Sequence, residues 1–274
     1  MRRLLAAILL LPALLPARDA AGQTMRASYE VIAAGMVVLE LDAWIEMTPA
    51  AYRVETSLRT RGIAYLVASG EQVSRASGGF VGVAARPADF VSEGVWRGRV
   101  RRIVLAWREQ DPQVRELTPA ETEEREPVSE AQRRGTLDML SLVASIGRQV
   151  AASGHCDATA PVFDGRRRSD IVSTARGMER LAPWRGAWHG DALRCDYEGR
   201  MVAGFRHDQD RAEAARPQRG TAWIAAPYGG APAVPVRVDI PTRWFGTVTA
   251  VLLRAEPMVA LPAQTPPRAA NRRG

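Results

Sequence analysis

The residues best suited to chemistry in this chain lie in one short stretch, PVFDGRRRSDIV, at positions 161–172. Planar guanidinium groups form paired hydrogen bonds with carboxylates and phosphates. The stretch is therefore a candidate contact for an anionic group or a protein partner. The residues of this candidate contact are Asp164, Gly165, Arg166, Arg167 and Arg168.

The same stretch also predicts a turn between two strands. An Asp-Gly pair favours a two-residue type I′ turn, because that turn needs positive φ at both positions. In such a hairpin Arg166 and Arg168 share one face and Arg167 points to the other, so we expect at least one arginine to pair with a carboxylate such as Asp170 or Asp196. A solvated hairpin with an ion pair is the simpler interpretation. A guanidinium fork that holds a carboxylate or phosphate head group is the alternative.

The two cysteines, Cys156 and Cys195, predict a disulfide, because the start of the chain predicts export to an oxidising compartment. Closing a loop of about 40 residues would stabilise the fold by about 4 kcal/mol in the chain-entropy description. The alternative is a redox or nucleophilic cysteine. No C-x-x-C pair supports it, and His155 is only a sequence neighbour of Cys156.

Signatures of other enzyme classes are missing from the sequence. There is no G-x-S-x-G nucleophile elbow and no phosphate-cradling glycine loop. The three histidines, His155, His189 and His207, do not cluster, and the HDQD stretch at 207–210 is more typical of a polar loop than of a cation site. We therefore expect a non-catalytic protein without a metal or cofactor. A hydrolase with no recognisable motif remains the enzymatic alternative.

The first 22 residues predict a secretory signal peptide. Two arginines precede an apolar run that ends before Arg18, and small residues at 20–22 offer a cleavage site near Gly22. The run is too short for a transmembrane helix, which needs about 20 apolar residues. We expect a soluble periplasmic protein with a single β-rich domain at 23–255 and a disordered Pro- and Arg-containing tail at 256–274.

The chain has 274 residues and a formal net charge of +7, and all 37 basic residues are arginine. The arginines are spread along the sequence, whereas nucleic-acid binding predicts a concentrated basic stripe or a known motif. We therefore expect no nucleic-acid partner. With 46% hydrophobic residues, the chain can bury a sizeable core.

Alternating apolar and polar residues predict about a dozen strands, and these strands would position the candidate contact at 164–168 and the two cysteines. Short connections favour an antiparallel meander. The charged, proline-containing segment 109–135 predicts a solvated excursion. One long helix is expected at Thr136–Ala152, capped by Thr136. It should pack through an apolar stripe of Met139, Val143, Ile146 and Val150, widened by Leu140 and Leu142. The fold class is therefore mainly β, a curved antiparallel sheet or open barrel wrapped around one long α-helix.

Several motifs occur in a characteristic order, and together they resemble an uncharacterised exported family of proteobacteria, the domain of unknown function numbered 3108. The likeness extends from Tyr29 to Leu253, and GTLDMLS at 135–141 is similar to the family's helix-opening segment. It implies a β-spiral similar to periplasmic lipoprotein and lipid carriers, and it implies no activity. The matching pieces are Cys156, Phe163–Arg168, Cys195, Arg200–Phe205, Trp223 and Ile240–Gly246.

Two non-catalytic functions follow from this fold. A curved sheet with an apolar interior could hold a lipid or a lipoprotein segment in an apolar cleft. Alternatively, the protein is an envelope scaffold that binds a protein partner or peptidoglycan through its surface. An apolar cleft of several hundred Å³ would favour the carrier, and a solid core with a flat patch would favour the scaffold.

Overall fold

The computed structural model describes residues 23–62, 64–65, 69–243 and 246–258. The predicted signal peptide at 1–22 and residues 259–274 of the predicted tail lie outside these ranges. The predicted tail begins too early, because a strand continues to Pro257. The strands in the described residues are β1 (Gln23–Ala33), β2 (Met36–Met47), β3 (Ala51–Thr60), β4 (Gly70–Val81), β5 (Ala84–Trp96), β6 (Arg99–Arg108), β7 (Asp111–Thr118), β8 (Ala158–Phe163), β9 (Arg168–Leu181), β10 (Gly190–Ala203), β11 (Gln218–Ala225), β12 (Val234–Thr242) and β13 (Gly246–Pro257).

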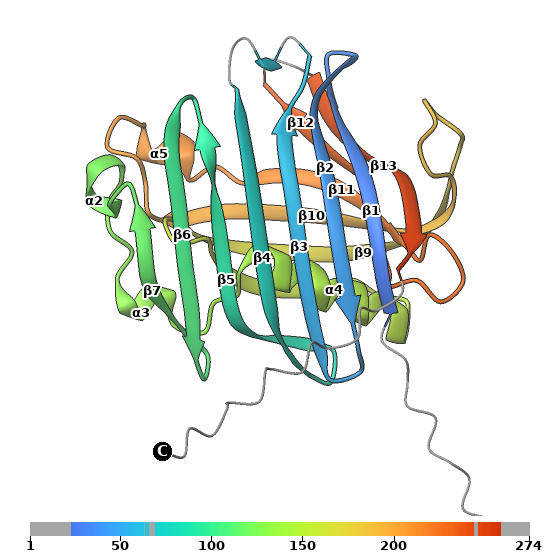
Figure 1. The fold of residues 1–274 in the computed structure, drawn as a ribbon, viewed down its shortest axis with the longest axis horizontal. Coiled ribbons are helices and arrows are strands. Elements are labelled where there is room, and N and C mark those ends of the chain that lie inside the picture. Colours follow the sequence, from blue (N-terminus) through green and yellow to red (C-terminus); the bar gives the residue numbers. More distant parts are fainter. Residues whose placement is uncertain (1–22, 63, 66–68, 244–245, 259–274) are drawn as a thin grey trace, which may run out of the picture.

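These 13 strands form one antiparallel sheet in the order β7-β6-β5-β4-β3-β2-β1-β13-β12-β11-β10-β9-β8. The pairing of β1 with β13 joins an N-terminal meander to a C-terminal one. The sheet is curved, and β9, β10 and β11 cross behind the strands of the first half (Figure 1). It does not close, because β7 and β8 are its two ends. The predicted curved antiparallel sheet is therefore confirmed.

Alternation of apolar and charged residues explains why the chain forms these strands. On the inner face of β1, Met25 and Ala27 are fully buried. On the outer face of β4, Arg75 donates to Glu55 on β3 and to Glu93 on β5, each over 2.9 Å. Cross-strand pairs of opposite charge therefore line the solvent-exposed face of the sheet.

The helix between the two meanders, α4 (Met139–Ser153), has 15 residues and begins later than predicted. Asp138 rather than Thr136 is its N-cap, accepting from the Ser141 amide over 2.9 Å. It contacts β3, β4 and β5 from the first half and β8, β11 and β12 from the second, so it lies between the two halves (Figure 1). The expectation of one long helix is corrected, because the described residues contain this four-turn helix and three helices of four residues each. The short helices are α2 (Glu121–Glu124), α3 (Glu130–Arg133) and α5 (Arg211–Ala214).

The predicted apolar stripe of α4 is confirmed in part. Ile146 and Val150 pack against the buried cluster around the disulfide and Leu142 is buried, whereas Met139 is 46% exposed. The buried face also contains Ala144 and Gly147. A Cβ added at Gly147 would lie 2.2 Å from the carbonyl oxygen of Ala233. The helix buries these small residues because the backbone just before β12 approaches it closely.

Arg148 ties α4 to two hairpin turns of the sheet. Its guanidinium group donates to the carbonyl oxygens of Thr48 (3.0 Å), Pro49 (2.6 Å) and Gly82 (2.8 Å). It also lies over the Phe80 ring, 4.4 Å from the ring centroid. A single side chain therefore fixes the helix against the β2–β3 and β4–β5 turns.

A buried polar network surrounds the start of α4. The Ser141 hydroxyl donates to Asp138, and the Tyr52 hydroxyl donates to Ser141 over 2.6 Å. Asp138 and Ser141 are both completely buried. Burial raises the pKa of the Asp138 carboxyl above its ordinary value, although the hydrogen bonds from Ser141 oppose this shift.

The segment 109–135, predicted as a solvated excursion, contains the edge strand β7 and the helices α2 and α3. A register shift opposite Val104 and Leu105 interrupts the alternation that would have indicated β7. In addition, an edge strand tolerates charged residues that a central strand would exclude. In the second half, residues 190–203 form one long strand, β10.

Candidate functional site

The hairpin loop between β8 and β9 differs from the predicted two-residue turn. Phe163 pairs with Arg168, so the loop contains the four residues 164–167. Gly165 alone in this loop has a positive φ, at 91°. The Asp164 carboxylate accepts from the backbone amides of Arg166 (2.9 Å) and Arg167 (2.7 Å), which closes the loop. The aspartate therefore acts through its side chain and not through the left-handed backbone that a type I′ turn needs.

The arginines of this loop have separate contacts. Arg166 is 6% exposed and donates to the carbonyl oxygen of Pro119 over 2.7 Å. Arg167 donates back to Asp164, with N···O distances of 2.8 and 2.7 Å. Arg166 and Arg167 were predicted to lie on opposite faces of a strand. In the structure both lie in the loop instead.

Arg168 begins β9 and forms the expected ion pair with Asp170, over 2.9 Å. Asp196, the other carboxylate proposed for these arginines, pairs instead with Arg176 (2.8 Å) and Arg194 (3.4 Å).

The loop is wedged between β6 and the segment that follows β10. A Cβ added at Gly165 would lie 2.4 Å from a methyl carbon of Ile103. One added at Gly204, where φ is +80°, would lie 2.0 Å from the carbonyl oxygen of Arg166. Both glycines are therefore required where backbone approaches its neighbours closely.

Two adjoining cavities lie beside this loop, of about 390 and 260 Å³, and together we call them the arginine cleft. The first cavity is lined by Trp96, Arg97, Arg99, Arg101, Glu124, Arg125 and Arg206. The second shares Trp96, Arg101 and Arg125 with it and adds Glu71, Gln72, Phe90, Ser92, Glu93, Gly94, Val95, Ile103, Asp164, Arg166 and Arg167. Seven arginines and four acidic residues thus belong to the lining, but the Glu93 carboxylate pairs with Arg75 and Arg102 on the outer face of the sheet, so positive charge prevails in the cleft.

Distant segments build the arginine cleft. Trp96, Arg97 and Arg99 come from the hairpin between β5 and β6, and Arg125 follows α2. Arg125 forms an isolated antiparallel bridge with Arg206, and the Glu126 amide donates to the Phe205 carbonyl oxygen over 2.9 Å. These bonds connect the segment after α2, next to the β7 edge of the sheet, with the segment that follows β10 (Figure 1).

The charges of the cleft are only partly compensated. Glu124 accepts from Arg101 over 3.0 and 3.1 Å and pairs with Arg99 over 3.3 Å. The hydrogen bond from Arg101 is the main reason why the pKa of the Glu124 carboxyl is lowered. Burial lowers the pKa of the Arg125 guanidinium, and the positive charge of Arg167 adds to this effect. A bound anion would relieve this repulsion.

The second cavity combines aromatic and polar walls. The Gln72 amide nitrogen donates to the hydroxyl of Ser92 over 2.9 Å, so the orientation of this side chain is fixed. Phe90 and Trp96 belong to the same inner face of β5 as Ser92. The Trp96 ring occupies the space above Gly70, where a Cβ would lie 2.0 Å from a ring carbon.

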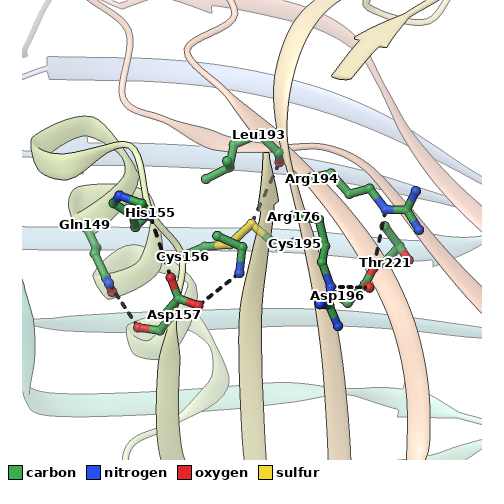
Figure 2. Close-up of a disulfide and its surroundings, with 11 residues drawn as sticks. Gln149, His155, Cys156, Asp157, Arg176, Leu193, Arg194, Cys195, Asp196 and Thr221 are labelled. Atoms are coloured by element: carbon green, nitrogen blue, oxygen red, sulfur yellow. Dashed lines mark hydrogen bonds and ion pairs between the residues drawn. A yellow bond between two sulfur atoms is a disulfide. The ribbon is translucent and has the colours of Figure 1, made fainter. Parts of the chain in front are cut away.

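The cysteines form a disulfide that ties the loop after α4 to β10 (Figure 2). Cys156 and Cys195 are 0% and 1% exposed and pack in an apolar cluster with Leu193, Ile224 and Ala233. Next to the disulfide, Asp157 accepts from the Ala175 amide over 3.1 Å. The arrangement is that of a structural crosslink within the core.

Three findings concern the other candidate groups. His155 lies 3.8 Å from the Asp157 carboxylate and is largely exposed. Among the described residues, no three or more His, Cys, Asp or Glu side chains are placed to hold a metal ion. No helix in the described part of the chain is long and apolar enough to cross a membrane.

Sequence reasoning identified one wall of the arginine cleft, the 164–167 loop, and missed most of the rest. Arg99 and Arg101 alternate along β6 and so share its inner face, a signal that was available in the sequence. Arg125 and Arg206 gave no such signal, because each lies in a segment without apolar periodicity.

Comparisons with known proteins address the fold and the family. A sequence model of the family described as "Protein of unknown function (DUF3108)" matches residues 24–253. No curated protein matches the chain. One similar solved structure, with a TM-score of 0.50 and 10% identity, is titled "Crystal Structure of Beta-barrel-like Protein of Domain of Unknown Function DUF1849 from Brucella abortus". That similarity covers 86% of this chain and 98% of the Brucella protein, and it extends to the fold alone.

Proposed function

The chain belongs to the DUF3108 family, and from this premise we propose that it is a non-catalytic cell-envelope protein that binds the anionic head group of a lipid or lipoprotein segment in the arginine cleft. The observation that carries this proposal is the set of seven arginines around two adjoining cavities. Guanidinium groups in a partly enclosed site bind carboxylate and phosphate oxygens more strongly than they do in bulk water.

The packing of the interior supports binding of a head group at the cleft over storage of a whole acyl chain inside the sheet. Met25, Leu105, Phe163 and Leu252 are completely buried in one apolar cluster. The helix α4 also lies between the halves of the sheet. A lipid would therefore place its charged group in the arginine cleft and leave its acyl chains in the membrane or with a partner protein.

The position of the main hydroxyl–carboxylate pair supports a non-catalytic role. Ser141 and Asp138 are hydrogen-bonded, as a nucleophile and its activating group would be, but both are completely buried. A substrate carbonyl could not reach the Ser141 hydroxyl without unfolding of the start of α4. Export to the periplasm belongs to the same proposal, and the buried disulfide supports it, since such bonds persist in oxidising compartments.

A scaffold that binds a protein partner or peptidoglycan is the second candidate function. The filled interior favours it, because an envelope scaffold needs a surface and no apolar cavity. In that case the arginine cleft would bind carboxylates of the partner.

Native mass spectrometry of protein purified from the periplasm tests the first function. We expect a co-purified anionic lipid on the wild-type protein and loss of most of it from the Arg97→Gln/Arg99→Gln double variant. Arg219→Gln is the matched control, because Arg219 is exposed on β11 and does not line the cleft. Absence of a lipid, together with no binding of wild-type protein to phosphatidylglycerol vesicles, would refute lipid binding. Retention of a protein or peptidoglycan fragment would favour the scaffold.

A further inference from the structure

We infer that the group held by the arginine cleft is a phosphorylated saccharide, with its phosphate in the first cavity and its sugar ring in the second. This inference rests on the proposed function and names the chemistry of its ligand. It follows from the different walls of the two cavities.

The first cavity is built for a multivalent anion. Five arginines and one carboxylate line it, and the arginines approach from three separate segments: the β5–β6 hairpin, the residue after α2 and the segment after β10. A planar carboxylate offers two oxygens in one plane. A tetrahedral phosphate presents oxygens in several directions, so it matches donors that surround it.

The second cavity has a mixed polar wall that is unsuited to an acyl chain. Its lining includes four arginines and the Asp164 carboxylate, which accepts from Arg167 over 2.7 Å, whereas the Glu93 carboxylate pairs with Arg75 on the outer face of the sheet. An apolar chain would cover these charged groups at a cost in free energy. Uncharged groups with many hydroxyls suit such a wall, because each hydroxyl can accept from a guanidinium group and donate to a carboxylate.

Aromatic and amide groups in the second cavity fit a sugar ring in particular. Phe90 and Trp96 provide ring faces, on which the C–H bonds of a pyranose can pack. Gln72 is held by its hydrogen bonds to Ser92 (2.9 Å) and Ser74 (3.2 Å), so its amide is fixed before a ligand arrives. Fixed polar groups beside apolar walls are typical of small-molecule sites.

The two cavities are arranged for one ligand. Trp96, Arg101 and Arg125 line both, so a phosphate in the first cavity lies next to the entrance of the second. A sugar linked directly to phosphate spans this junction without a spacer. The phosphate and the ring would then share the contacts of Arg101 and Arg125.

Isothermal titration calorimetry with the purified full-length mature protein tests this inference. The probes are glucose 1-phosphate, inorganic phosphate, glucose and sn-glycerol 3-phosphate. We expect glucose 1-phosphate to bind at least about tenfold more tightly than inorganic phosphate or glycerol 3-phosphate, since two or three additional hydrogen bonds and ring contacts are gained. Flotation with phosphatidylcholine vesicles, with and without lipid A as a phosphorylated disaccharide lipid, distinguishes a membrane-linked source from a free sugar phosphate.

Two variants separate the cavities. Arg99→Gln should weaken both glucose 1-phosphate and inorganic phosphate by about tenfold. Gln72→Ala should weaken glucose 1-phosphate alone, and Arg219→Gln should leave both unchanged. Circular dichroism checks that each variant retains the wild-type sheet.

The outcomes distinguish this inference from the proposed function. Equal affinities for glucose 1-phosphate, glycerol 3-phosphate and inorganic phosphate would overturn the saccharide and leave an anion site. The same conclusion would follow if vesicles of phosphatidylglycerol bound and no sugar phosphate did. If neither any phosphate probe nor any anionic vesicle bound, both the saccharide and the proposed anion-binding function would be wrong.

Discussion

Removal of the Cys156–Cys195 disulfide should destabilise the protein strongly. The two cysteines are 39 residues apart in the sequence, and a crosslink over a loop of this length stabilises by about 4 kcal/mol through the entropy of the unfolded chain. For a domain of this size the loss corresponds to a fall in melting temperature of roughly 10 °C. Cys156→Ser should therefore melt well below the wild type under oxidising conditions.

The residue that replaces each cysteine affects the melting temperature in addition to the loss of the disulfide. Both sulfurs are buried among apolar side chains, so a serine there would leave a buried hydroxyl and add about 1–3 kcal/mol of destabilisation. The Cys156→Ala/Cys195→Ala double variant avoids this effect and isolates the crosslink. Reductant should lower the melting temperature of the wild type and leave that of the double variant unchanged.

The position of the disulfide predicts which parts of the protein lose local stability when it is removed. The disulfide joins the loop after α4 to β10, so hydrogen exchange should accelerate most in residues 150–158 and in β10 (Figure 2). Melting of the double alanine variant at the wild-type temperature under oxidising conditions would refute the reasoning. Uniform loss of protection across the sheet would contradict the local part of it.

Three further substitutions test other parts of the fold. Arg148→Met should lower the free energy of unfolding by about 3 kcal/mol, because charge-assisted hydrogen bonds to two hairpin turns are lost. A change under about 0.5 kcal/mol in urea unfolding would contradict the stabilising role of Arg148. Because burial raises the folded-state pKa of Asp138, its stabilising contribution is complete below the unfolded pKa of about 3.9 and is lost as pH rises through the folded pKa. Asp138→Asn should thus gain stability relative to the wild type as pH rises in urea titrations, and a gap independent of pH would count against a raised pKa. Gly204→Ala should lower the free energy of unfolding by about 2 kcal/mol or more in thermal unfolding. Gly229→Ala is the control, because a Cβ added there meets no atom within 4 Å, and its effect should stay within about 0.5 kcal/mol. Equal effects of the two substitutions would exclude close packing at Gly204.

Much of the fold follows from local sequence patterns. The period-two alternation in β1 and β2 indicates strands with one buried and one solvent-exposed face. This indication is local and does not depend on where the strands lie in space. Gly154, with φ at +70°, ends α4 at the place that the sequence indicates. The β7 strand was missed because its register shift and its edge position remove the alternation on which the prediction depends.

The arginine cleft depends on tertiary structure. Along the chain, Arg99, Arg125, Arg167 and Arg206 are separated by dozens of residues, so nothing in the sequence indicates that they belong to one site. Curvature of the sheet brings segments of its two halves together, and the bridge between Arg125 and Arg206 holds them there. Sequence by itself determined a disulfide-linked, alternating antiparallel sheet, because those features arise from local side-chain chemistry. Only the curvature of the sheet decided which charges face one another, because charge proximity depends on distance in space and not on distance along the chain.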